Sequence, residues 1–210
     1  MHPRLQSLLA GGALLLLPLA PIRAESPWSL HVRATWAATA DKSDAFSALG
    51  INFGANAIST NDKLIPEFDV DYAFTPSLAA EVVLSTPQKF DVSLAGVGKL
   101  GSFTCLPPTF LLQYHPSLGG GFEPYVGAGV NYTLIWNTNL SVASVPLGLD
   151  NDSFGLAGQA GFDWSIDANW SFNFDYKYIG IRSKVYAGSA ALTTARLNPS
   201  LYSIGFRYKF

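Results

Sequence analysis

Charged residues are scarce in this 210-residue chain, because only 13% are Asp, Glu, Lys or Arg, whereas an average soluble domain carries roughly 25%. The formal net charge is −2. Nucleic-acid binding is therefore not expected, since no basic excess is available to neutralise phosphates. Cys105 is the single cysteine, which excludes an intrachain disulfide. We interpret Cys105 as a small strand residue rather than a reactive thiol. The length fits one domain.

Groups suited to catalysis or metal binding are also few. Beyond residue 24 the chain has two histidines, His31 and His115, which fall on strands that we expect not to be neighbours. There is no G-x-S-x-G motif and no Cys/His cluster. We expect neither an enzyme nor a bound cofactor or metal. A Ser–His pair formed across strands is the alternative, because covalent catalysis needs a nucleophile with a positioned base.

The first 24 residues have the layout of a secretory signal peptide. Arg4 supplies a positive charge, an apolar run extends from Leu8 to Leu19, and Ala24 offers a small residue for cleavage. We expect residues 1–24 to be removed and residues 25–210 to form one outer-membrane domain. No later stretch provides the about 18 uncharged apolar residues that a membrane-spanning helix needs, although 49% of the chain is hydrophobic.

Apolar and polar residues instead alternate along the chain. In the C-terminal segment Tyr202, Ile204, Phe206, Tyr208 and Phe210 share one face, and mostly small or charged residues alternate with them. Such a period of two is typical of β-strands. The pattern predicts eight strands, an even number as in single-chain bacterial barrels. The predicted strands are residues 28–36, 64–74, 78–85, 109–114, 126–136, 156–164, 170–178 and 200–210.

The connections between these strands alternate in length. Short turns are expected at 75–77, 116–123 and 165–169. Long loops are expected at 37–63, 86–100, 137–152 and 187–195. Outer-membrane barrels place short turns in the periplasm and long loops outside the cell, so both ends of the mature chain should lie on the periplasmic side.

The aromatic side chains decide which face of the strands points outward. Five of them, from Trp170 to Tyr178, lie on one face of a single strand. A soluble barrel with this face inward is the alternative, but eight such faces do not fit into one small lumen at normal packing density. We therefore predict an all-β, transmembrane, eight-stranded antiparallel up-and-down β-barrel in the outer membrane of a Gram-negative bacterium, exported through the periplasm.

The opposite face carries charges of both signs, which should pair with one another in a narrow interior. The lumen of an eight-stranded barrel is just wide enough for side chains to fill it. We interpret this charged set as a plug near the periplasmic end, and a polar ion pathway is the alternative. The set consists of Arg33, Glu67, Asp69, Asp71, Glu81, Asp163, Asp175, Lys177, Arg207 and Lys209.

Four segments resemble motifs of a known family. They are LPPT at 106–109, PYVGAGVNYT at 124–133, GLAGQAGFD at 155–163, and RLNP at 196–199 followed by the ending FRYKF. In this order they resemble the OmpW family of small outer-membrane barrels, across the whole mature chain. The resemblance implies passive transport of small hydrophobic molecules through an apolar extracellular lumen, with the periplasmic end blocked and a lateral exit into lipid.

Apolar residues in the long loops are candidates for the extracellular funnel of such a pathway. They are Phe46, Leu49, Ile51, Phe53, Leu140, Leu147 and Leu149. The alternative is that these loops pack on each other or dip into lipopolysaccharide. A surface structural or adhesion barrel with a filled lumen and no transport is the alternative function.

Pro107 and Pro108 are candidates for the lateral exit, because proline cannot donate to a sheet ladder. A β-bulge that adjusts curvature is the other interpretation. Expected partners are outer-membrane lipid and lipopolysaccharide, small hydrophobic solutes, and the barrel-assembly machinery, which we expect to act through Phe210.

Overall fold

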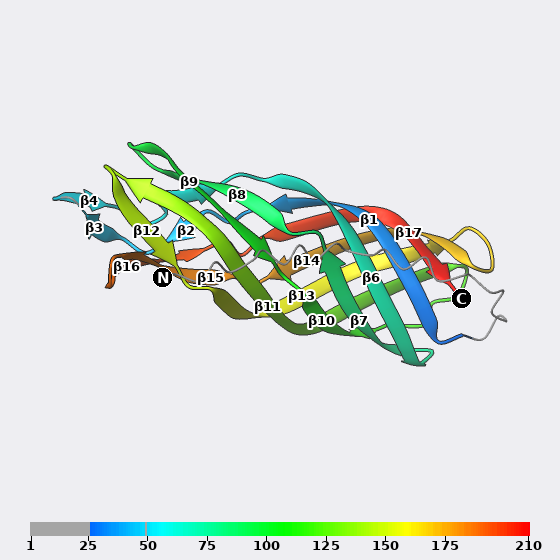
Figure 1. The fold of residues 1–210 in the computed structure, drawn as a ribbon. Coiled ribbons are helices and arrows are strands. Elements are labelled where there is room, and N and C mark those ends of the chain that lie inside the picture. Colours follow the sequence, from blue (N-terminus) through cyan, green and yellow to red (C-terminus); the bar gives the residue numbers. More distant parts are fainter. Residues whose placement is uncertain (1–25, 49) are drawn as a thin grey trace, which may run out of the picture.

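The computed structural model describes residues 26–48 and 50–210, which form a β-barrel (Figure 1). The barrel has eight long strands, and we call each of them a stave because most consist of two shorter β-strands that follow one another along the same line. In chain order the staves are β1 (Trp28–Ala38) with β2 (Lys42–Ser43), β5 (Ile58–Thr60) with β6 (Lys63–Thr75), β7 (Leu78–Ser85) with β8 (Gln88–Leu94), β9 (Gly98–Leu106) with β10 (Thr109–Tyr114), β11 (Phe122–Val142) alone, β12 (Val145–Leu149) with β13 (Asp152–Ser165), β14 (Trp170–Ile179) with β15 (Arg182–Ala187), and β16 (Ala190–Arg196) with β17 (Ser200–Lys209). A small separate hairpin consists of β3 (Phe46–Ala48) and β4 (Ile51–Phe53).

The barrel closes where the first stave meets the last. β1 pairs with β17 in an antiparallel ladder from Ser29↔Lys209 to Ala38↔Ser200, and its other edge pairs with β6. Closure leaves no open sheet edge at this level, as a sheet in hydrocarbon requires. The predicted eight-stranded antiparallel barrel is confirmed.

The described part of the chain contains no helix that is both long and apolar enough to cross a bilayer.

In the half of the barrel that holds the start of β1 and the end of β17, the apolar face points outward. Phe68, Phe172 and Phe206 are exposed on the outer surface, whereas His31 and Arg33 are buried inside. Aromatic pairs lie toward the periplasmic end, such as Trp170 with Tyr208 at 4.8 Å between ring centroids, where interfacial girdles are expected. The predicted direction of the aromatic stripe is confirmed.

The long connections are not the loops that the sequence suggested. Most of residues 86–100, 137–152 and 187–195 continue the staves as β8, β9, β11, β12, β15 and β16, which form tall hairpins at the left-hand end of Figure 1. The reason is a second core: Phe90, Phe103, Ile135, Leu140 and Leu147 pack together inside the hairpins. Beyond the membrane the apolar face turns inward, because the outer surface there meets water.

Candidate functional site

An apolar cavity lies inside the tall hairpins. Its wall is formed by side chains that include Ile58, Val92, Phe103, Leu140 and Leu147, and it exposes no polar surface. The cavity is small, with a volume of about 40 Å³. Dry, apolar cavities of this kind suit apolar ligands rather than water.

A second apolar cavity lies nearer the membrane. Ile65, Val83, Phe90, Pro107 and Leu201 are part of its wall. Three further side chains, those of Cys105, Ile181 and Leu197, line both cavities, so the two cavities are neighbours separated by these side chains. Cys105 is free and buried in this wall, in agreement with its interpretation as a packing residue.

The barrel wall is interrupted beside the second cavity. The ladder between the second and third staves ends at Glu67↔Ser85 and resumes at Thr60↔Val92. Between these rungs the Asp91 amide donates to Asn61 Oδ1 at 2.7 Å, and Lys63 Nζ lies 5.9 Å from the centroid of the Phe90 ring. Pro87 lies in the interrupted part of the third stave, between β7 and β8. The sequence analysis did not identify this proline.

The two prolines predicted to break the ladder lie next to the same opening. Pro107 and Pro108 separate β9 from β10. On the side of the third stave the pairing passes from Thr109↔Val83 to Cys105↔Gln88, a shift of one residue. On the side of β11 the register is unchanged across the two prolines and shifts farther along, between Trp136 and Asn139. The structure therefore shows both an interrupted ladder and, at the prolines, a one-residue irregularity on the side of the third stave.

The charged interior set forms one network below the cavities. Arg33 donates from Nη1 to Glu67 and Glu81 at 3.2 and 3.3 Å, and it also contacts Asp69. Lys177 Nζ donates to Glu67 Oε1 at 2.8 Å and to Asp175 Oδ1 at 2.5 Å. The Arg33 and Lys177 side chains are fully buried, so their charges are balanced by carboxylates rather than by water.

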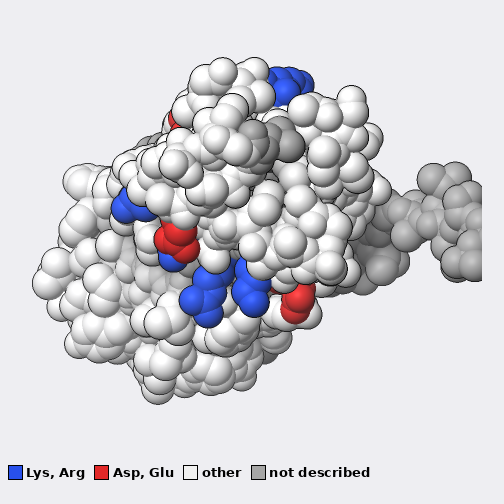
Figure 2. Space-filling view, turned by 90° about the vertical axis from the view of Figure 1, so that its left-hand side faces the viewer, with Lys and Arg blue, Asp and Glu red and all other residues white. Residues whose placement is uncertain are grey.

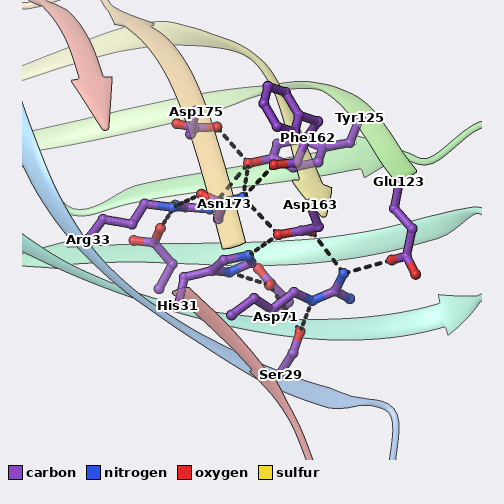
Figure 3. Close-up of polar contacts among 12 residues, drawn as sticks. Ser29, His31, Arg33, Asp71, Glu123, Tyr125, Phe162, Asp163, Asn173 and Asp175 are labelled. Carbon is purple, nitrogen blue, oxygen red and sulfur yellow. Dashed lines mark hydrogen bonds and ion pairs between the residues drawn. The ribbon is translucent and has the colours of Figure 1, made fainter. Parts of the chain in front are cut away.

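A lower layer of the network lies toward the periplasm (Figure 3). His31 Nδ1 is 2.8 Å from Asp71 Oδ2, and its Nε2 is 3.4 Å from Asp163 Oδ1. Arg207 Nη1 donates to Asp163 Oδ2 at 2.9 Å and to Glu123 Oε2 at 3.0 Å. Lys209 belongs to the same network, because its Nζ donates to Glu123 Oε1 at 2.9 Å. The whole predicted charged set therefore lies in one region of the lumen.

The sequence analysis did not identify two residues of this plug, Tyr125 and Glu123. Tyr125 receives hydrogen bonds from Arg33 and Asn173 and donates to Asp175 Oδ2 at 2.9 Å, and Glu123 binds both C-terminal cations. The predicted strand began at residue 126, whereas β11 begins at Phe122. Extending the alternation backward from Gly127 would have placed both side chains inside.

Metal ligation was not expected, yet His31, Asp71 and Glu81 bring potential ligand atoms within 4.8 Å of one another. These groups already have partners. Asp71 accepts from Ser29 at 3.1 Å, and Glu81 accepts from Gln159 at 2.7 Å. We therefore describe the cluster as part of the ion-paired plug.

The candidate funnel residues are divided between two places. Leu140, Leu147 and Leu149 line the upper cavity. Phe46 and Phe53 stack at 5.0 Å between ring centroids and pack against the upper core. Ile51 is exposed at the tip of the β3–β4 hairpin. Leu49 lies outside the described residues, as do residues 1–24, the predicted signal peptide.

A closed barrel of eight antiparallel staves, with an apolar outer belt and a paired charge network inside, defines the class of small outer-membrane β-barrels. The sequence profile of the OmpW family matches residues 28–210, and the chain belongs to this family. The resemblance predicted from its motifs is confirmed, as is the outer membrane of a Gram-negative bacterium as its location.

Known relatives agree with this assignment. The chain is 36% identical over 190 residues to the uncharacterized outer-membrane protein y4mB of Sinorhizobium fredii, covering 88% of this chain and 80% of that protein. It is 31% identical over 207 residues to outer membrane protein W of Vibrio cholerae, covering 92% and 94%. The crystal structure of OprG from Pseudomonas aeruginosa matches with a TM-score of 0.73 and 30% identity, covering 87% of this chain and 95% of that one.

Proposed function

We propose that this barrel is a passive, non-enzymatic route for small hydrophobic molecules. A solute enters the apolar upper cavity from outside the cell and leaves sideways into the lipid at the wall opening, which we define by Pro87, Pro107 and Pro108. The observation that carries this proposal is the pair of neighbouring apolar cavities, the lower of which lies beside an interrupted wall and above the plug.

The free energies of the possible directions favour the sideways path. An apolar solute gains roughly 25 cal/mol for each Å² of surface that leaves water, so the upper cavity attracts it. A solute that passed downward would separate buried ion pairs such as the one between Lys177 Nζ and Glu67 Oε1, which lie 2.8 Å apart. An uncompensated buried charge is strongly unfavourable. Moving through the wall leads from one apolar medium into another.

A structural or adhesion barrel is the second candidate, favoured by how well the lumen is filled. Only about 40 Å³ of each inner cavity is open to the centre of a water-sized sphere. Transport therefore requires side chains of the upper cavity to move as a solute passes. Uptake measurements separate the two functions, because a structural barrel would leave solute entry unchanged.

Polar substitutions in the upper cavity should reduce uptake. We expect the double change Leu147→Asp and Leu149→Asp to lower the entry of a long-chain alkane toward that of cells lacking the protein, because two carboxylates would have to be desolvated along the path. Entry is measured with radiolabelled alkane in intact cells, and heat-modifiable migration on gels reports whether the barrel is folded.

Leu118→Asp is the matched control, since Leu118 is exposed in the turn at the periplasmic end. It should leave uptake unchanged. A folded Leu147/Leu149 variant with normal uptake would show that β12 does not line the entrance.

Restoring backbone donors at the wall opening should slow the exit. We expect the double change Pro87→Val and Pro107→Val to reduce alkane uptake several-fold while the barrel remains folded, because each valine supplies the ladder donor that proline lacks. Pro116→Val, in the turn after β10, is the control. Unchanged uptake in a folded wall variant would place the exit elsewhere.

A further inference from the structure

A row of cations crosses three neighbouring strands on the outer wall. Arg182 of β15 is directly opposite Arg196 of β16, and Arg196 is directly opposite Lys42 of β2. Residues paired in this way share a face of the sheet, and Lys42 and Arg182 are exposed. Figure 2, which looks onto the end with the tall hairpins, shows several Lys and Arg side chains close together beside fewer acidic ones.

The row is only partly neutralised by protein groups. Asp44 accepts from both terminal nitrogens of Arg196, at 2.7 and 3.3 Å. These hydrogen bonds lower the pKa of Asp44, so its carboxylate stays charged. Within residues 26–48 and 50–210, no carboxylate forms an ion pair with Lys42 or Arg182. Like charges directly opposite one another on adjacent strands are unfavourable, so the row favours an added anion.

A groove in the outer wall begins at these arginines and continues toward the membrane belt. We call it the wall groove; its lining includes Phe154, Leu156, Tyr178, Gly180, Arg182 and Arg196. It is roomier than the inner cavities, with about 620 Å³ open to the centre of a water-sized sphere. Gly158 leaves part of its floor free of side chains, since no atom lies within 4 Å of the position that a Cβ would take there.

The lower part of the wall groove is apolar and faces outward. Leu156 is 72% exposed and Phe154 is 60% exposed. The groove is therefore amphipathic, with guanidinium groups at the extracellular end and apolar side chains below. Arginine pairs well with phosphate in a two-pronged geometry, and basic pockets at a membrane surface recognise lipid head groups.

We propose that the wall groove binds one phosphorylated glycolipid of the outer leaflet, the lipid A part of lipopolysaccharide. A phosphate lies between Arg182 and Arg196, and an acyl chain lies over Leu156 and Gly158. The groove shares Ile181 with the walls of both inner cavities, but Arg182 and Arg196 line neither cavity, and the proposed exit is at Pro87 and Pro107 on other staves. Alkane uptake by the variants below therefore tests transport independently.

The test measures lipid retention by the purified full mature chain in detergent, with native mass spectrometry and added lipid A that carries both phosphates. We expect the double variant R182Q/R196Q to bind lipid A about tenfold more weakly or worse, since hydrogen bonds to charged groups contribute roughly that factor or more. K89Q/K99Q removes two exposed charges from β8 and β9 and should bind like the wild type. Heat-modifiable migration verifies that each variant folds.

Two further arms identify the ligand. Lipid A without phosphates should bind weakly to the wild type, and inorganic phosphate alone should not displace lipid A. Leu156→Ser should weaken retention, whereas Leu112→Ser, at an exposed position on β10, should not. The proposal would be overturned if R182Q/R196Q retained lipid A as well as the wild type does, or if K89Q/K99Q lost as much of it. It would also be overturned if lipid A without phosphates bound tightly, or if inorganic phosphate displaced lipid A.

Discussion

Lys177→Met is expected to destabilise the folded barrel by about 3–5 kcal/mol, because removing one partner of a buried ion pair leaves an uncompensated charge. Lys177 is fully buried and its Nζ lies 2.8 Å from Glu67 and 2.5 Å from Asp175. Methionine has a similar shape but no charge, so these carboxylates lose their counterion. Equilibrium unfolding by urea in lipid vesicles measures the change in free energy.

Lys99→Met is the matched control for this change. Lys99 also pairs with a carboxylate, that of Asp91 at 3.0 Å, but both side chains are largely exposed to solvent. We expect little effect, since exposed ion pairs contribute little to stability. Comparable stability losses in the two variants would mean that water reaches the plug and that its charges are not buried.

Ile204→Arg should destabilise the barrel by about 2–4 kcal/mol, the usual effect of arginine at the lipid-facing midplane of a barrel. Ile204 is 54% exposed on the outer face of β17. Along the same face it lies between Tyr202 and Tyr208, so we expect it within the lipid-facing belt that these two aromatic side chains bound. The same urea unfolding in vesicles measures the loss.

Ile166→Arg tests whether this effect depends on depth. Ile166 is 61% exposed, slightly more than Ile204, but it lies in the turn between β13 and β14. The expected loss there is about 0–1 kcal/mol, as near the membrane interface. If Ile204→Arg were as mild as Ile166→Arg, the outer face of β17 would not lie in hydrocarbon.

The membrane-embedded half of the barrel could be predicted from the sequence because its two faces have opposite chemistry. On β1 the buried residues His31 and Arg33 alternate with exposed Val32, and one phase of alternation describes the whole strand. The same alternation places most of the plug residues on the inner face. There they are expected to pair, because charges that face into a narrow lumen have only one another as partners. Glu123 and Tyr125 escaped only because the start of β11 was placed too late.

The extracellular half could not be predicted in the same way. In the third stave, Glu81 and Val83 of β7 are buried at odd positions, whereas Phe90, Val92 and Leu94 of β8 are buried at even positions. The phase therefore changes across Pro87, and continuing the β7 phase would place the aromatic ring of Phe90 outside. Inward apolar residues in water and outward apolar residues in lipid give the same alternation, so the sequence does not show where the environment changes.

The position of the wall opening follows from pairing between staves, which a single sequence does not encode. Pro107 and Pro108 indicate a broken ladder on their own stave, but the longer gap between Glu67↔Ser85 and Thr60↔Val92 belongs to two other staves. It arises because β5 and β6 pair with different strands of the third stave. Only the three-dimensional register brings Ile65 to the same cavity as Pro107.

Seven of the eight staves are interrupted between their membrane-embedded and extracellular parts, and β11 alone continues through all 21 of its residues. At several of these breaks backbone hydrogen bonds still join neighbouring staves, such as the one from the Leu197 amide to the Ile181 carbonyl at 3.0 Å. Between the second and third staves, by contrast, the ladder is missing from Glu67↔Ser85 to Thr60↔Val92. Regions with fewer protecting hydrogen bonds open at lower free energy than the rest of a protein. We therefore expect amide hydrogens beside the gap between the second and third staves to exchange with solvent before those of the continuously paired β11.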